Sequence, residues 1–137
     1  MGTIIDTSIL IDVFHAGSAF EDWSLNAIAD ARRRGDVLIN PLIYAEMAAG
    51  FATVDTLEVA LSPASFIRED LPWEGAHAAG QAFMQYRRGG GDKRSPLPDF
   101  YIGAHALVRG HDLLTRDAAR YRTYFPMIRL ITPETHP

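Results

Sequence analysis

The chain has 137 residues, 47% of them hydrophobic and 10% aromatic, which is enough for the core of one globular domain over residues 1–137. It contains no cysteine, which excludes disulfides, thiolate metal sites and a cysteine nucleophile. The formal net charge of −4 argues against binding nucleic acid by bulk positive charge, but it leaves room for a nuclease whose acids hold cations.

No apolar run reaches the roughly 18 residues that a membrane-spanning helix needs. The amino-terminal segment also lacks the basic and apolar regions of a signal peptide. We therefore expect a cytoplasmic protein that does not associate with membranes.

Short apolar runs alternate along the chain with stretches of helical periodicity, a pattern typical of an α/β fold with a parallel sheet. Strands are expected at residues 3–5, 37–40, 66–71, 112–115 and 128–131. Helices are expected at residues 8–14, 19–34, 42–51, 53–61, 73–88, 99–109 and 117–124. The segment 89–98, GGGDKRSPLP, is predicted to be a loop because glycine and proline interrupt regular structure.

Four carboxylates lie in surroundings that are otherwise almost without charge: Asp6, Glu46, Asp99 and Asp117. Asp6 is the only charge in the first eleven residues, and Glu46 is the only one within VLINPLIYAEMAAGFATV. A carboxylate in such a setting needs a hydrogen-bond donor, a cation or water, because burying it bare is costly.

The expected positions of these acids place them at one edge of the sheet. Asp6 and Asp117 come directly after strands, Glu46 lies in the helix that follows another strand, and Asp99 opens a helix. The carboxyl ends of parallel strands form the crevice in which such folds bind ligands. Four acids gathered there repel one another and need a divalent cation, and carboxylate oxygens suit Mg²⁺ or Mn²⁺.

Each acid also has an ordinary structural interpretation when it is taken alone. Asp6 and Asp117 are well placed to cap helices, and Asp99 complements a helix dipole. Other acids are expected to be surface charges on helices: Asp12, Asp22, Asp30 and Glu58. His105, on an apolar helix, is expected to be packed in the core, and the histidines show no metal-binding spacing.

Basic residues are concentrated around the glycine-rich loop that precedes Asp99: Arg87, Arg88, Lys93 and Arg94. This group has two interpretations, either a solvated loop or a clamp on the phosphates that flank the acidic crevice.

Three segments together give the chain a resemblance to a known family: IIDTSILIDV, NPLIYAEM and LPDFYIGAHALVRGHDLLTRDAARY. In order, spacing and flanking residues they resemble the motifs of PIN-domain ribonucleases, specifically the VapC-type toxins of prokaryotic toxin–antitoxin pairs. The resemblance covers nearly the whole chain. It implies a PIN-like three-layer α/β/α domain with a central, mainly parallel sheet.

The resemblance also implies a Mg²⁺- or Mn²⁺-dependent endoribonuclease that hydrolyses RNA with a metal-activated water. Asp6, Asp99 and Asp117 would hold metal directly or through water, and Glu46 would complete the acidic shell and orient the attacking water. Ser8 and Thr115 would support these ligands. The partners implied are RNA, a cognate VapB-type antitoxin and a second copy in a homodimer.

Two alternatives stay open at this point. One is a solitary PIN-domain nuclease that processes RNA without an antitoxin. The other is a non-catalytic metal-binding regulatory domain, which predicts no cleavage with Mg²⁺ or Mn²⁺.

Overall fold

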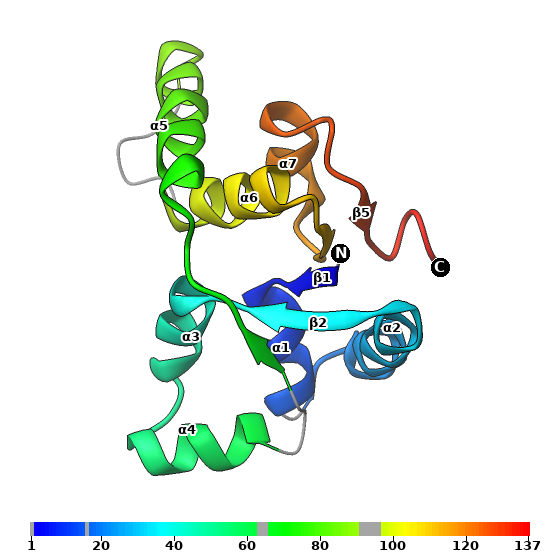
Figure 1. Ribbon diagram of the computed structural model, residues 1–137. Coiled ribbons are helices and arrows are strands. Elements are labelled where there is room, and N and C mark those ends of the chain that lie inside the picture. The colour runs from blue at the N-terminus through cyan, green and yellow to red at the C-terminus, as the bar shows by residue number, and fades with distance from the viewer. Residues whose placement is uncertain (1, 16, 63–65, 91–96) are drawn as a thin grey trace.

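The chain folds around a five-stranded parallel sheet with the strand order β3-β2-β1-β4-β5. The computed structural model describes residues 2–15, 17–62, 66–90 and 97–137. Figure 1 shows the sheet at the centre of the molecule. The strands are β1 (Gly2–Ile5), β2 (Asp36–Ile39), β3 (Ile67–Arg68), β4 (Asp112–Leu114) and β5 (Leu130–Ile131).

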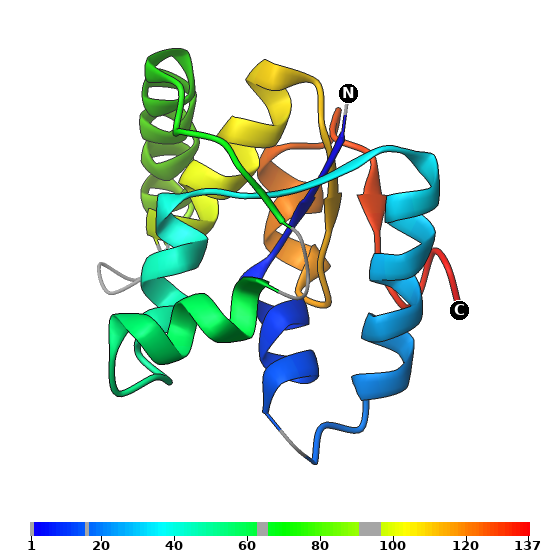
Figure 2. The same ribbon diagram turned by 60° about the horizontal axis from the view of Figure 1, so that its bottom comes forward.

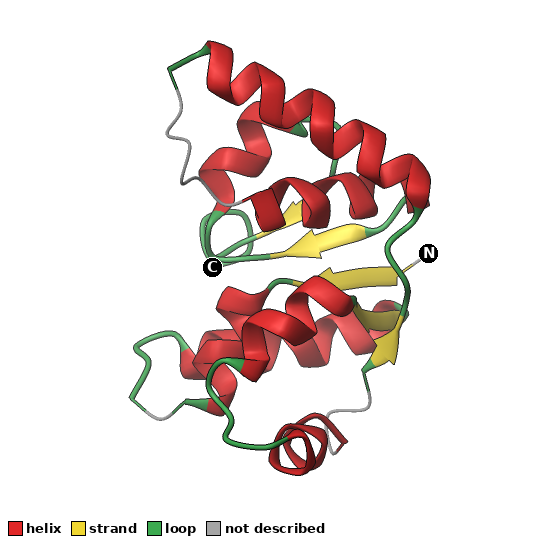
Figure 3. Cartoon of the chain, turned by 90° about the vertical axis from the view of Figure 1, so that its left-hand side faces the viewer, coloured by secondary structure: helices red, strands yellow, loops and turns green. Residues whose placement is uncertain are grey.

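Helices cover both faces of the sheet, which confirms the predicted three-layer α/β/α architecture (Figure 3). One layer contains α1 (Thr7–Phe14), α2 (Glu21–Arg34), α3 (Pro41–Ala48) and α4 (Val54–Leu61). The other layer contains α5 (Trp73–Arg88), α6 (Leu97–Arg109) and α7 (Ala118–Tyr124). Figure 2 shows α1 and α2 side by side, where they pack against each other.

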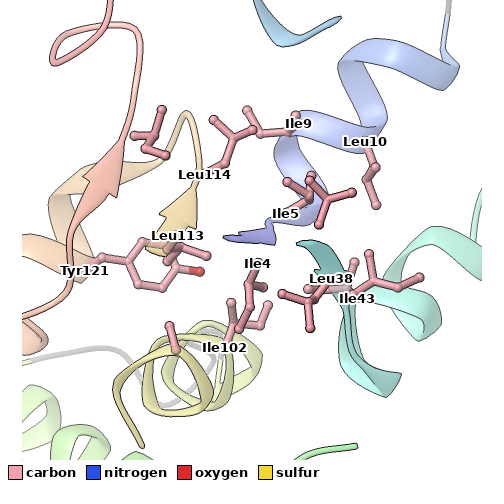
Figure 4. Close-up of a cluster of buried hydrophobic side chains, with 14 of the residues drawn as sticks. Ile4, Ile5, Ile9, Leu10, Leu38, Ile43, Ile102, Leu113, Leu114 and Tyr121 are labelled. Carbon is pink, nitrogen blue, oxygen red and sulfur yellow. The ribbon is translucent and has the colours of Figure 1, made fainter. Parts of the chain in front are cut away.

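The core lies on both sides of the central strand β1. Successive side chains of a strand point to opposite faces, so Ile4 and Ile5, both fully buried, pack into different layers. Ile4 points toward Ile102 of α6, whereas Ile5 lies on the side of α1, with Leu10 (Figure 4). A strand buried on both faces carries consecutive apolar residues, as β1 does at Ile4 and Ile5.

Several element boundaries differ from the predicted ones, and the reasons are local. Asn40 ends β2 because its side chain accepts a hydrogen bond from the backbone N–H of Ile43 and so caps α3. The edge strand β3 has two residues, both exposed, instead of the six predicted. Helix α6 begins at Leu97, so Asp99 lies within its first turn.

The expectation that Asp12 is a surface charge is wrong. Its side chain is 1% exposed and accepts hydrogen bonds from Ser18, Ser24 and Arg116. Burial raises the pKa of Asp12, but these donors outweigh burial and hold the pKa below its ordinary value.

Within the described residues, no helix is long and apolar enough to cross a membrane.

Candidate functional site

The sheet topology brings the carboxyl ends of β1 and β4 together, and the first and fourth predicted acids follow these two strands. Asp6 directly follows β1 and caps α1, where its Oδ1 accepts the backbone N–H of Thr7 at 2.9 Å. Asp117 precedes α7, and its own backbone N–H donates to Oγ1 of Thr115 at 2.9 Å. Asp6 is buried, whereas Asp117 is exposed.

Two hydroxyl groups donate to the second oxygen of Asp6. Thr115 Oγ1 lies 2.7 Å and Ser8 Oγ 3.1 Å from Asp6 Oδ2. Each hydroxyl also accepts a backbone N–H, that of Asp117 for Thr115 and that of Arg116 for Ser8. Their hydroxyl protons are therefore directed to Asp6, an arrangement that favours its ionised form.

Glu46 lies on α3 and is held by a residue of α1. Thr7 Oγ1 donates to Glu46 Oε1 at 2.7 Å, while the backbone N–H of the same threonine is bound to Asp6. Glu46 is exposed, so one carboxylate oxygen is fixed by Thr7 in an otherwise open position. Thr7 thus connects two of the predicted acids.

Asp99 lies on α6 and forms an ion pair with α7. Arg120 Nη1 donates to Asp99 Oδ2 at 2.7 Å, and the two side chains are 29% and 19% exposed. Burial raises the pKa of Asp99, and Arg120 lowers it. The net pKa lies above the ordinary value, because burial, together with repulsion from Glu46 and Asp117, outweighs the effect of Arg120.

Electrostatic interactions link the four carboxylates in a chain: Asp6 interacts with Asp99 and Glu46, and Asp99 interacts with Glu46 and Asp117. The pKa of Asp6 is raised to about 6, because burial, with smaller contributions from Asp99 and Glu46, outweighs the lowering effect of Thr115 and Ser8. Together with the effects of Glu46 and Asp117 on Asp99, these interactions connect all four acids electrostatically.

A buried tyrosine next to this cluster gives an independent test of whether a cation fits. The Tyr121 side chain is 1% exposed, and its hydroxyl has no hydrogen-bond partner among the described residues. Burial raises its pKa well above 10, and after burial the contributions come from Asp6, Asp99, Glu46 and Asp117. An acidic cluster beside an unpartnered hydroxyl fits a site that is completed by water and a hard cation.

A second group of side chains of the kinds that bind metals lies elsewhere in the fold. Among the described residues, Glu69, His105 and His111 are the group whose ligand atoms all lie within 4.8 Å of one another. Glu69 Oε1 lies 2.7 Å from Nε2 of His105 and 2.8 Å from Nε2 of His111. The four predicted acids do not form so close a group.

The hydrogen bonds of this second group do not fit a metal ion. Gly2 donates its backbone N–H to Nδ1 of His111 at 3.1 Å. Asn40, whose Oδ1 caps α3, turns its Nδ2 to Nδ1 of His105 at 3.0 Å. Both Nδ1 atoms therefore accept, so both Nε2 atoms carry protons and donate to Glu69. A metal-bound histidine needs the opposite arrangement, in which the second ring nitrogen is the donor.

The predicted basic group is only partly within the described residues. Arg87 and Arg88 occupy the last turn of α5 and are exposed, and Arg87 lies over the ring of Phe83 at 6.0 Å. Lys93 and Arg94 lie outside the described residues. The packing of His105 in the core is confirmed, because its side chain is fully buried.

Several polar contacts of this region are not predicted from the sequence. Thr7 and Arg120 contact predicted acids, and Glu69 and His111 complete the histidine cluster. Glu69 falls near the end of the predicted strand 66–71, next to Asp70, and nothing in the sequence distinguishes these two acids. Nothing local distinguishes Arg120 from the other arginines of RDAARYR.

The chain belongs to the PIN domain family, whose model matches residues 3–126. It is 29% identical over 130 residues to Ribonuclease VapC10 of Mycobacterium tuberculosis, a match that covers 95% of this chain and 90% of that protein. The predicted resemblance is thereby confirmed.

Solved structures with the same fold include components of toxin–antitoxin complexes. A chain of VapBC2 from Rickettsia felis bound to a promoter DNA fragment has a TM-score of 0.73 and 15% identity, with 96% of this chain and 98% of that chain covered. A toxin–antitoxin complex from Klebsiella pneumoniae gives a TM-score of 0.70 and 22% identity, with the same coverage. At these identities the likeness shows the fold.

Proposed function

We propose that this protein is a Mg²⁺- or Mn²⁺-dependent endoribonuclease that acts as a VapC-type toxin. The observation that carries the proposal is the position of Asp6 and Asp117 after the adjacent parallel strands β1 and β4. Thr7 ties Glu46 to Asp6, and electrostatic repulsion links Asp99 to the same cluster. The similarity to Ribonuclease VapC10 supports RNA as the substrate.

The acidic site supplies hard oxygen ligands, which match these cations. Asp6, Asp99 and Asp117 would hold the metal directly or through water, and Glu46 would complete the shell. When bound, Mg²⁺ or Mn²⁺ lowers the pKa of a coordinated water and stabilises charge on phosphate oxygens. Since the four acids do not form a close group, we expect some of these contacts to be water-mediated.

The chain's own residues prepare this chemistry. Ser8 and Thr115 hold Asp6 in the ionised form by donating to its Oδ2. Thr7 anchors one oxygen of Glu46, which leaves the other oxygen to accept a hydrogen bond from the attacking water and so orient it. Asp117 is fixed at the same edge by its backbone bond to Thr115.

Partners follow from the same comparisons. Because chains with this fold occur in VapBC and related toxin–antitoxin complexes, we propose a VapB-type antitoxin as the cognate partner. Arg87 and Arg88 at the end of α5 are proposed to contact RNA phosphates. A homodimer of this chain and a cytoplasmic location remain predictions.

The test is RNA cleavage by purified protein with Mg²⁺ or Mn²⁺, followed by sequencing of the new 5′ ends. Asp99→Asn is expected to lower the cleavage rate roughly a hundredfold or more, because it removes a charge on which the transition state depends. The matched control is Asp112→Asn. Asp112 begins β4 at the other end of the strand and faces Arg129 at 3.6 Å. This control is expected to cleave like the wild type.

Two outcomes would contradict the proposal. One is wild-type protein that leaves RNA intact with both metals while it binds its antitoxin. The other is cleavage by Asp99→Asn at the wild-type rate, which would remove Asp99 from the site.

A further inference from the structure

Arg120 is a cation placed inside the proposed acidic site. It lies three residues after Asp117, in the first turn of α7, and its guanidinium binds Asp99 at 2.7 Å. Among the described residues, no other lysine or arginine forms a hydrogen bond or ion pair with any of the four proposed acids. Arg120 therefore neutralises part of the acidic cluster in the metal-free protein.

Two aromatic rings define the position of this guanidinium. Arg120 Cζ lies 5.6 Å from the ring centroid of Tyr86 on α5 and 5.9 Å from that of Phe100 on α6. The two rings are themselves 5.5 Å apart. Contacts of this kind attract a cation and support its planar group, so the side chain does not depend on Asp99 alone for its place.

The charge balance changes when the site takes a divalent cation. The negative charge of Asp99 is then partly neutralised by the metal, so Asp99 attracts Arg120 less strongly. The metal also repels the guanidinium, because both are positively charged. Arg120 can then pair with a different anion, and the phosphates of a bound RNA are anions at the same site. A guanidinium presents five donors in a planar fork that fits two phosphate oxygens, and at 29% exposure this one is accessible.

We propose that Arg120 binds a phosphate of the RNA substrate, turning to it from Asp99 when Asp99 binds a divalent cation. This inference rests on the proposed function and adds a substrate-binding residue to it. It also explains why an arginine is paired with Asp99, a proposed metal ligand. If Arg120 had no other role, its positive charge would only compete with the metal and weaken metal binding.

The test compares Arg120→Gln with Arg122→Gln in RNA binding. Arg122 lies on the same helix but pairs with Glu134, and both side chains are largely exposed, so the control removes the same charge outside the site. Affinity for a fluorescent single-stranded RNA is measured in EDTA and in Ca²⁺, under conditions in which the RNA stays intact. In Ca²⁺ we expect Arg120→Gln to bind roughly tenfold more weakly, since a charge-assisted hydrogen bond is lost.

Four further readouts separate phosphate binding from a structural role. The slope of log affinity against log salt should fall by about 0.7 for Arg120→Gln in Ca²⁺, as expected for one phosphate contact on a single strand. The loss should be much smaller in EDTA, where Asp99 holds the guanidinium. Calorimetry should show Mn²⁺ binding at least as tight as in the wild type, and Arg120→Lys should restore part of the RNA affinity.

The inference is overturned if Arg120→Gln binds RNA in Ca²⁺ as well as Arg122→Gln does. It is equally overturned if Arg120→Gln loses Mn²⁺ affinity, because Arg120 would then only position Asp99. The proposed function survives either result as long as wild-type protein cleaves RNA. A wild-type protein that neither binds divalent cations nor cleaves RNA contradicts both.

Discussion

Burial and hydrogen bonding act in opposite directions on Asp6. Its environment provides three donors, the backbone N–H of Thr7 and the hydroxyls of Ser8 and Thr115, all of which favour a carboxylate. Burial and the neighbouring acids nevertheless raise the pKa of Asp6 to about 6. The donors favour the ionised form of Asp6 while burial opposes it, a combination that fits the proposed role of Asp6 as a ligand of a divalent cation.

The sign of the resulting pH dependence follows from this shift. The pKa of Asp6 rises from 3.8 in the unfolded chain to about 6 in the folded one. Between these values the folded protein binds a proton that the unfolded chain releases, so ionised Asp6 destabilises the fold at higher pH. The penalty is fully present above pH 6 and disappears as the pH falls toward 4, and it is on the order of 3 kcal/mol.

Urea unfolding in EDTA at pH 7.5 and pH 4.5 measures this contribution when wild type is compared with Asp6→Asn. The variant lacks the titrating group, so the difference in unfolding free energy should shift in favour of the wild type at the lower pH. A difference that stays the same at both pH values would contradict the assigned environment of Asp6.

The elements that carry the acids are tied together by a buried charge. Asp12 of α1 lies 2.5 Å from Arg116, in the connection from β4 to α7, and accepts hydrogen bonds from Ser18 and Ser24. The Arg116 guanidinium also lies over the ring of Phe20 at 4.6 Å. Because Arg116 stands between Thr115 and Asp117, this pair holds the β4–α7 connection against α1 and α2.

Replacing Asp12 by alanine is expected to lower the unfolding free energy by about 3 kcal/mol or more, because it leaves several donors unpaired in a buried position. The control is Asp30→Ala, since Asp30 forms an exposed pair with Arg33 within α2 and such pairs contribute little. Chemical denaturation of both variants is the measurement. Equal unfolding free energies would show that the Asp12 network does not stabilise these elements.

Sequence reasoning predicted what depends on local pattern and strand order. Alternating apolar runs gave the parallel sheet, and acids after strands gave the edge where Asp6 and Asp117 lie. The burial of Asp12 could not be predicted, because its partner Arg116 is 104 positions away and no residue near Asp12 indicates this pairing. The pairing of Asp99 with Arg120 likewise depends on how α6 and α7 pack, which helical periodicity does not specify.

At the scale of the whole molecule, the proposed acidic site depends on distant segments that the fold brings to one side of the sheet. Asp6 and Asp117 follow adjacent parallel strands, while Glu46 and Asp99 reach the same region from α3 and α6, which are in contact. The histidine cluster shows that proximity alone does not make a metal site, since its ring nitrogens are committed to other bonds. The hydrogen bonds of the four carboxylates, by contrast, do not require that they carry a proton.

The central claim is that these four acids form one divalent-cation site, and calorimetric titration with Mn²⁺ tests it directly. Wild type and Asp112→Asn are expected to bind Mn²⁺ with the same affinity. Weaker binding is expected for Asp6→Asn, Glu46→Gln, Asp99→Asn and Asp117→Asn. The account is contradicted if the wild type takes up no Mn²⁺, or if all four variants bind it as tightly as Asp112→Asn.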